Sequence, residues 1–159
     1  MRFLICFLMI FSVVVASPGA SAKKVINGSG LPIPRFVDTK SCRVNMRVGP
    51  GNNYKIVWTY LKKGFPLKVV AEFDFWRKVQ DVDGAEGWVH RSMVMPSKSV
   101  LFNDKITSFY ENMNDETPVC YVERGVVGTA LSEEKQGWVK VKVRDTKGWV
   151  RKKSLWGVL

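Results

Sequence analysis

Four side chains in the first half of the sequence are suited to binding a ligand: Asn45, Arg47, Tyr54 and Trp76. Arg47 could hold a carboxylate through two parallel hydrogen bonds. Tyr54 could stack on the apolar part of the same ligand. Trp76 follows the segment EFDF, which we interpret as a strand-to-strand connection, where a ring can lie at the rim of a groove. Together these residues predict a shallow groove lined by aromatic and basic side chains.

The segment around Arg47 also has a purely structural interpretation. Asn45 and Arg47 alternate with apolar residues, as on the polar face of a half-buried strand. In the turn Gly49-Pro50-Gly51, proline fixes φ and glycine permits backbone angles closed to other residues. In this alternative, Arg47 pairs with an acid of its own domain, Glu72 or Asp74, and no ligand is involved.

Residues for catalysis or metal binding are scarce. His90 is the single histidine, and nucleophilic chemistry would require Cys42 or Cys120 as an activated thiolate beside it. Two such cysteines and one histidine do not fill a structural zinc site. We therefore expect a protein that is not an enzyme and that needs no metal and no cofactor.

The N-terminal residues 1–22 have the order of a secretory signal peptide. Arg2 precedes an apolar run, and Ala20-Ser21-Ala22 supplies small residues for cleavage. The alternative is an anchor that stays uncleaved. We expect cleavage, export to the periplasm and a mature chain that does not span the membrane, because no later apolar stretch is long enough.

The charge of the chain favours anionic partners. The sequence has 25 Lys and Arg against 14 Asp and Glu, a formal net charge of +11 at pH 7. Outside the cytoplasm such partners are cell-wall carboxylates, anionic lipid surfaces or acidic proteins, and we expect no nucleic acid. An oxidising compartment also allows a disulfide between Cys42 and Cys120. The alternative is two thiols whose geometry prevents a bond.

Two segments of the chain repeat each other. Residues 75–89 and 137–150 both carry a Trp, alternating Val, a polar turn and Gly-Trp-Val, so Trp76 matches Trp138. Upstream, residues 60–72 align with 121–133, which sets Tyr60 on Tyr121 and Gly64 on Gly125. A unit of about sixty residues is thus used twice.

Each unit has the pattern of a small β domain. Basic and apolar residues alternate with period two, turn residues recur at short intervals, and RSMV and KKSLW could each form one 3₁₀ turn. We predict an all-β chain of two small barrels. The predicted boundaries are an extended leader at 23–38, a first barrel at 39–95, a connection within 95–102 and a second barrel at 100–159.

The ordered motifs of the first unit resemble the bacterial SH3-like domain, in the tandem form of small exported proteobacterial proteins. The matching features are Asn45-x-Arg47, the Gly-Pro-Gly turn, Lys63-Gly64, Trp76 and Gly87-Trp88-Val89. The resemblance covers roughly residues 38–159 and implies an SH3-like barrel in each unit. It also implies a non-catalytic module of a kind commonly attached to cell-wall hydrolases.

The second unit lacks Asn-x-Arg and the Gly-Pro-Gly turn but keeps the barrel motifs. We therefore expect the first unit to be the binding unit, with Asn45, Arg47, Tyr54 and Trp76 at its site. The function that follows is an exported module that recognises carboxylates of the peptidoglycan peptide. The alternative is an adaptor that binds a peptide segment of another envelope protein.

Overall fold

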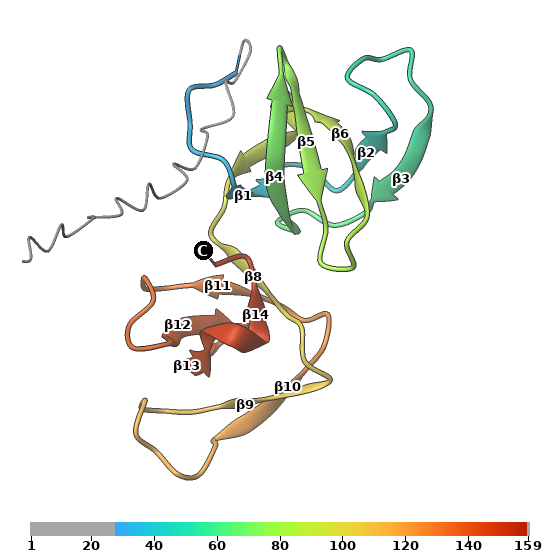
Figure 1. Ribbon diagram of the computed structural model, residues 1–159. Coiled ribbons are helices and arrows are strands. Elements are labelled where there is room, and N and C mark those ends of the chain that lie inside the picture. Colours follow the sequence, from blue (N-terminus) through green and yellow to red (C-terminus); the bar gives the residue numbers. More distant parts are fainter. Residues whose placement is uncertain (1–27, 159) are drawn as a thin grey trace, which may run out of the picture.

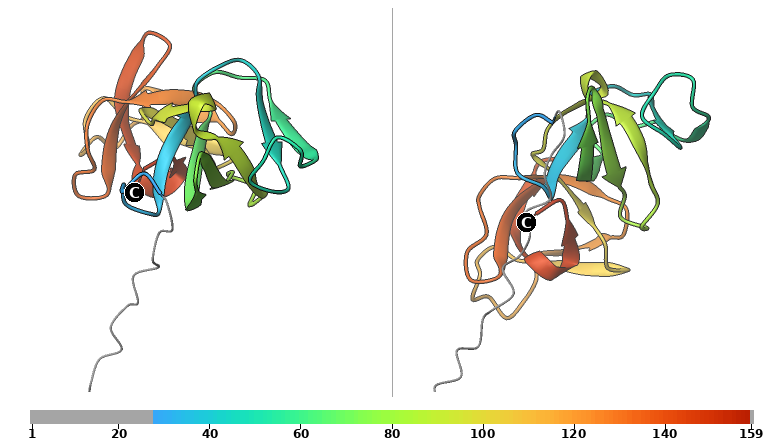
Figure 2. Two further views of the ribbon diagram at one scale, coloured as in Figure 1. Left: turned by 90° about the horizontal axis from the view of Figure 1, so that it is seen from above. Right: turned by 45° about the horizontal axis from the view of Figure 1, so that its top comes forward.

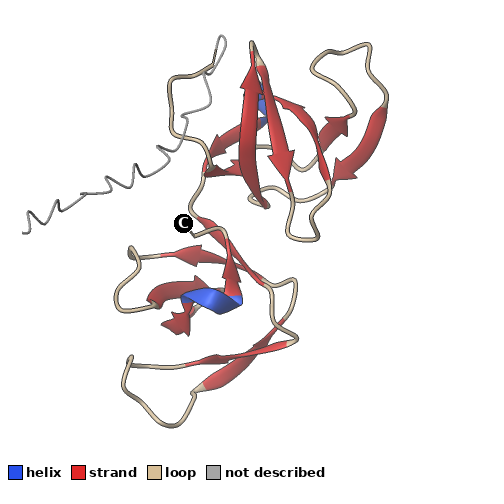
Figure 3. Cartoon of the chain, in the orientation of Figure 1, coloured by secondary structure: helices blue, strands red, loops and turns tan. Residues whose placement is uncertain are grey.

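The computed structural model describes residues 28–158, which form two β domains in tandem (Figure 1). Only two short 3₁₀ helices, η1 (Arg91–Met93) and η2 (Lys152–Ser154), interrupt the strands of the described residues (Figure 3). The prediction of an all-β fold is confirmed. Both 3₁₀ helices lie where the sequence allowed such a turn.

The first domain is a single antiparallel sheet in the order β3-β2-β6-β5-β4-β1-β7, which curls around its core. Strand β3 is therefore one edge of this sheet. The strands are β1 (Arg35–Thr39), β2 (Val44–Arg47), β3 (Ile56–Tyr60), β4 (Pro66–Phe73), β5 (Trp76–Gln80), β6 (Glu86–His90) and β7 (Val94–Pro96).

The second domain divides into a five-stranded sheet, in the order β13-β12-β11-β8-β14, and the hairpin β10-β9. Its strands are β8 (Ser99–Phe102), β9 (Ile106–Phe109), β10 (Cys120–Glu123), β11 (Val127–Ala130), β12 (Trp138–Val143), β13 (Thr146–Arg151) and β14 (Leu155–Trp156).

Each domain has its own apolar core, built from the alternating positions that the sequence indicated. Val79 of β5 and Val139 and Val141 of β12 are buried, while the neighbouring Lys78 and Lys140 are only half-buried. The first core contains Val37, Val44, Met46, Tyr60, Leu67, Val69, Val79 and Val89. The second contains Val100, Phe102, Phe109, Val122, Val139, Val141, Val150 and Leu155.

Strand register shows that the repeated motifs occupy equivalent positions. Trp76 lies opposite His90, and Trp138 lies opposite Arg151. Gly87 and Gly148 are each buried where another element approaches. A Cβ added at Gly87 would lie 2.5 Å from Met46 Cγ, and one at Gly148 would lie 2.4 Å from Phe109 Cε1. The motif Gly-Trp-Val thus has a packing role in both domains.

One part of the predicted repeat alignment is wrong. Tyr60 pairs with Val44 and is buried, whereas Tyr121 pairs with Ser108 and is 66% exposed. Val122 is the buried residue that takes the place of Tyr60. The second domain is one residue shorter before its turn, so Gly64 and Gly125 still correspond, and both have positive φ.

The domain boundaries also differ from the sequence-based ones. Strand β1 begins at Arg35, so the last part of the predicted leader, 35–38, belongs to the first sheet. Strands β7 and β8 both extend into the predicted connection 95–102. Only residues 97–98 lie between them. The predicted signal peptide, 1–22, lies outside the described residues.

The leader joins the first domain because its polar groups meet Glu72. The Glu72 carboxylate is fully buried and accepts hydrogen bonds from Ser29 N at 2.6 Å and Ser29 Oγ at 2.9 Å. It also pairs with Arg35 and with Arg77 Nε, the latter at 2.9 Å. Two strands and the leader therefore share one buried ionic cluster, the Glu72 cluster.

The two domains are held together by Asp38 and by Trp156. The buried Asp38 carboxylate accepts hydrogen bonds from Ser97 Oγ at 2.6 Å, Lys98 N at 3.0 Å and Ser99 N at 3.1 Å. The Trp156 ring lies edge-on to Phe36 with centroids 5.2 Å apart. Figure 2 accordingly shows the end of the chain beside β1 in both views. The short connection is thus fixed at both ends.

Cys42 is exposed in the first domain, and Cys120 begins β10 in the second. Both are free thiols, so the structure lacks the disulfide that was one of the two alternatives. Among the described residues, no helix is long and apolar enough to cross a membrane.

Candidate binding site

A polar cleft of about 270 Å³ opens on the first domain between β2, β5 and β6. It brings together three of the four predicted site residues, Asn45, Arg47 and Trp76. Tyr54 does not line it. The residues that line the cleft are Arg43, Asn45, Arg47, Asn52, Trp76, His90, Ser92 and Met93.

The Gly-Pro-Gly turn is shaped by the ring of Tyr54. A Cβ added at Gly49 would lie 2.5 Å from Tyr54 Cδ1, and one at Gly51 would lie 3.1 Å from Tyr54 Cδ2. Neither glycine has a positive φ, so the turn needs them for space and not for unusual backbone angles. Tyr54 packs on its own turn, which explains why its ring is absent from the cleft.

Arg47 reaches the cleft from the end of β2. Its Nη1 donates to the carbonyl oxygen of Tyr54 at 2.6 Å, so the turn sets the direction of the guanidinium. No ion pair within residues 28–158 involves Arg47. A guanidinium has five N–H donors, and one such bond leaves most of them for a ligand.

The predicted alternative partner of Arg47 is engaged elsewhere. Glu72 pairs with Arg35 and Arg77 in the buried cluster, and Asp74 makes no ion pair among the described residues. Burial would raise the pKa of Glu72, but the hydrogen bonds from Arg35 and Ser29, with the charge of Arg35, outweigh it and lower that pKa. The internal pair proposed for Arg47 is therefore wrong.

Trp76 and His90 form one wall of the cleft. They face each other across β5 and β6, with ring centroids 5.4 Å apart and planes at 78°. Trp76 is only 8% exposed, so the rim position predicted for it is wrong, and little of its ring is available to a ligand. His90 Nδ1 accepts from Ser92 N at 3.3 Å and lies 2.7 Å from Ser92 Oγ. Since Nδ1 is an acceptor there, the neutral ring carries its proton on Nε2.

Asn45 adds a second donor beside Arg47. Its side-chain oxygen accepts from Thr59 Oγ1 at 3.0 Å across β2 and β3. That bond fixes the amide so that its nitrogen remains a donor. The cleft thus presents cationic and neutral donors and contains no Asp or Glu among its lining residues. This donor set is suited to a carboxylate or a similar oxyanion.

The equivalent region of the second domain is occupied by its own side chains. Tyr110 takes the place of Arg47, because each lies opposite the tryptophan of its Gly-Trp-Val motif. The Tyr110 ring packs edge-on against Trp138 at 5.4 Å, and the Arg151 guanidinium carbon lies 3.9 Å from the Trp138 ring centroid. The positions that offer donors in the first domain therefore pack on tryptophan in the second.

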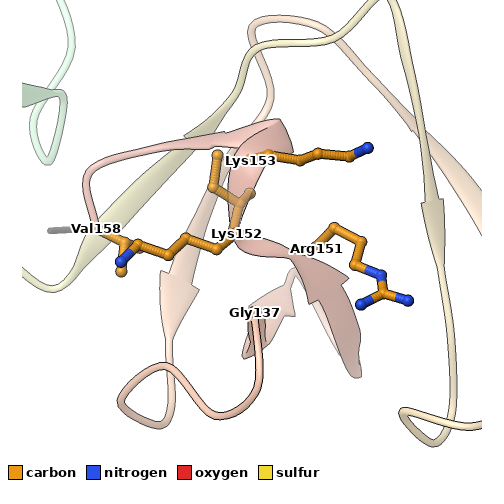
Figure 4. Close-up of a pocket in the computed structure, with 6 residues that line it drawn as sticks. Gly137, Arg151, Lys152, Lys153 and Val158 are labelled. Carbon is orange, nitrogen blue, oxygen red and sulfur yellow. The ribbon is translucent and has the colours of Figure 1, made fainter.

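A different pocket, of about 670 Å³, lies beside η2 in the second domain. It is lined by Gly137, Arg151, Lys152, Lys153, Leu155 and Val158. Its cations do not converge: Arg151 and Lys153 extend to one side, while Lys152 runs toward Val158 (Figure 4). Lys152 also lies 3.6 Å from Glu134 Oε2. We therefore take the cleft of the first domain as the site.

From the sequence, His90 was considered only for catalysis, and Ser92, Arg43 and Met93 were not predicted at the site. His90 directly follows Gly-Trp-Val, and Trp76 opens the strand paired with that motif. If the two strands form a hairpin, His90 lies opposite Trp76, so the sequence could have indicated His90 as a neighbour of Trp76. Within the described residues, no group of three or more His, Cys, Asp or Glu could hold a metal ion.

The fold and the cleft define a pair of small β-barrel domains, one of which carries an open polar site. The chain belongs to the bacterial SH3 domain family. The family model matches residues 40–96 and 114–157, which is more than half of the sequence. The resemblance stated from the sequence is confirmed. Members of this family are typically non-catalytic binding modules.

Two solved structures are similar to the chain, NlpC1 and NlpC2 from Trichomonas vaginalis. The first is 12% identical, with a TM-score of 0.37 over 87% of this chain and 51% of that one. The second is also 12% identical, with a TM-score of 0.35 over 77% and 48%. The chain spans about half the length of either structure. No curated protein matches it.

Proposed function

We propose that the protein is an exported binding module whose first domain recognises a carboxylate of the peptidoglycan peptide. The observation that carries this proposal is Arg47, which lies in an acid-free cleft beside Asn45 and His90 and has no ion-pair partner in the described chain. A second observation supports it. The equivalent position in the second domain is Tyr110, which packs on Trp138.

Arg47 and Asn45 would bind the ligand through charge-assisted and neutral hydrogen bonds. A guanidinium fork can engage both oxygens of a carboxylate, while the Asn45 amide and the His90 Nε2–H can bind neighbouring peptide carbonyls. The ring of Trp76 contributes as the buried wall against which His90 is oriented. The net positive charge of the chain would attract a polyanionic wall over a longer range.

Export to the periplasm is part of the proposal and rests on the order of charge, apolar run and small residues in 1–22. N-terminal sequencing of the protein recovered from the cell envelope tests it. A first residue at or near Lys23 is expected. A chain that still begins at Met1 would contradict export by cleavage.

The test of the site is co-sedimentation of the purified protein with isolated wall sacculi. Arg47→Ala should weaken binding by about 1.5–3 kcal/mol if the guanidinium meets a carboxylate. Arg47→Lys keeps the charge but loses the fork, and should weaken binding less. Lys105→Ala, an exposed cation of the second domain, is the matched control and should bind normally.

A thermal melt of each variant separates binding from folding. Unchanged sedimentation of Arg47→Ala together with a lower melting temperature would assign Arg47 to the fold alone. Equal weakening by Lys105→Ala would reduce the effect to general charge attraction and contradict a specific site.

A second candidate function is an adaptor for another envelope protein. One observation favours it: the edge strand β3 exposes Ile56, Val57 and Trp58, the last at 57%. Exposed apolar edges of this kind can pair with a strand of a partner. Trp58→Ser should then abolish recovery of that partner from envelope extracts while leaving sedimentation with sacculi unchanged.

A further inference from the structure

A separate pocket of about 400 Å³ lies where the two domains meet. The first domain contributes Lys63 and Gly64 from the turn before β4. The second contributes Ser99, Thr129, Lys142 and Arg144 from β8, β11, β12 and the turn after β12. Domain interfaces are common places for ligand sites. No acidic side chain lines this pocket.

The strand register aligns the polar groups of this pocket in one row. Ser99 lies opposite Thr129, and Thr129 lies opposite Lys142. Residues directly opposite in a sheet point to the same face, so these three side chains are neighbours across β8, β11 and β12. The other face of the sheet carries the buried residues Gly128 and Val141, which contact the core.

The row continues into a pair of like charges. Lys142 lies directly opposite Lys147 on β13, an arrangement that destabilises a sheet unless an anion offsets it. No ion pair within residues 28–158 involves Lys63, Lys142, Lys147 or Arg144. Asp145 of the same hairpin does not line the pocket. The positive charge here is uncompensated.

Arg144 lies in the two-residue turn between β12 and β13. Its φ is +52°, in the left-handed region that glycine or asparagine adopts with less strain. A two-residue hairpin turn requires such an angle at its first position, and this turn places the charged residue Arg144 at the pocket.

The pocket is also held in one shape. Asp38 accepts a hydrogen bond from Ser99 N, which fixes the start of β8 against the first domain. Gly64 N donates to Thr39 O at 2.8 Å, and a Cβ at Gly64 would lie 3.4 Å from Ser99 Oγ. The backbone segments that carry Gly64 and Ser99 are therefore fixed relative to each other before a ligand arrives.

We propose that this pocket binds a phosphate group, carried on a phosphate ester, across the two domains. Three cations and two hydroxyl groups surround it, which is more charge than the single charge of a carboxylate can neutralise. A phosphate monoester has about −1.5 to −2 charges near pH 7 and three terminal oxygens that accept hydrogen bonds. This proposal is independent of the carboxylate site at Arg47.

The experiment is a titration with inorganic phosphate at constant ionic strength, followed through the backbone amide NMR signals. Saturable shifts are expected at Ser99 and Thr129. Lys142→Gln and Lys63→Gln should each raise the dissociation constant about tenfold, as for the loss of one charge-assisted hydrogen bond. Lys105→Gln, outside the pocket, is the matched control and should leave the constant unchanged.

Two further arms identify the source of the phosphate. Glycerol phosphate represents a soluble monoester, and vesicles of phosphatidic acid with phosphatidylcholine represent a lipid whose headgroup is a phosphate monoester. Lys142-dependent binding to either supports the proposal and names its source. Shifts that do not saturate, or equal weakening by Lys105→Gln, would overturn it.

Arg47→Ala keeps the two proposals distinguishable, because it should reduce binding to sacculi and leave the phosphate titration unchanged. A loss of phosphate binding in Arg47→Ala would overturn the assignment of the phosphate to the interdomain pocket.

Discussion

The two domains place equivalent strands in the same order, although in the second the hairpin β10-β9 meets β13 only at the bridge between Tyr110 and Trp149. They differ in polarity at equivalent interior positions. In the first, Tyr60 donates a buried hydrogen bond to Asp81 at 3.3 Å. Burial, then the charge and hydrogen bond of Asp81, raise the pKa of Tyr60 well above its usual range, so its phenol stays neutral. In the second, the corresponding residues are Val122 and Val143. The barrel therefore does not require these polar groups.

The same contrast holds for the Glu72 cluster and the cleft. Arg77 reaches Glu72 in the first domain, and Val139 stands at the equivalent position of the second. Arg47 and His90 line an open cleft, while Tyr110 and Arg151 pack on Trp138. Both domains keep the Trp and Gly-Trp-Val residues, so the fold does not depend on the polar residues that differ. The polar and charged residues that the second domain lacks are all found in the first domain, which carries the candidate site.

The largest effect that tests this contrast is expected for Glu72→Ala. It would leave Arg77 buried without its counter-charge, which typically costs about 3–5 kcal/mol. Urea unfolding should show the first domain destabilised by that amount. Glu86→Ala, which removes a surface pair with Lys78 in the same domain, should cost about 0–1 kcal/mol. Equal effects of the two variants would mean that burial of the cluster contributes nothing.

A smaller effect is expected for alanine at the two equivalent glycines. Gly148→Ala would push a methyl group into the Phe109 ring and to 2.6 Å from Tyr110 O. Gly87→Ala meets the flexible Met46 side chain, although Arg47 O is also only 2.9 Å away. Overpacking of this kind costs about 1–3 kcal/mol, and Gly148→Ala should lie at the upper end. Thermal melts that rank Gly87→Ala as the more damaging change would contradict the tighter packing around Gly148.

The smallest effect is a difference in pH dependence. The pKa of Glu72 is lowered in the folded chain, so its stabilising effect is present above its ordinary value of 4.5. It is lost as the pH falls through the folded pKa. The stability gap between the unmodified protein and Glu72→Gln should therefore shrink on acidification, with a slope below about 1.4 kcal/mol per pH unit. A gap that stays constant from pH 7 to pH 3 would rule out this linkage.

The fold was predictable because alternation and repeated turn motifs are local signals. Trp76, Trp138 and both Gly-Trp-Val motifs identified equivalent strands correctly. The alignment of the two units was wrong at Tyr60, because the second unit has one residue fewer between Val122 and Gly125. The turn glycines still align, so the sequence does not show where the residue is missing. The leader boundary failed because residues 35–38 form a strand by pairing with β4, which lies far along the chain.

The site was predictable in part for the same reason. Asn45 and Arg47 share one strand face, and Trp76 was included because it follows the segment EFDF, interpreted as a strand-to-strand connection. Tyr54 was expected beside them but does not line the cleft, because its ring packs on Gly49, a contact that no local pattern indicates. Which acidic side chain lies near Arg47 depends on which strands are adjacent in the sheet. A short stretch of sequence does not determine that order.

The contact of Asp38 with the connection has a thermodynamic consequence. Tandem domains on a flexible linker lose orientational freedom when one ligand touches both, and that loss reduces affinity. Here three hydrogen bonds from residues 97–99 to one carboxylate have already removed that freedom during folding. The pair is preorganised. A ligand that contacts Lys63 and Lys142 together therefore keeps the favourable energy of both contacts without the entropic cost of ordering the domains.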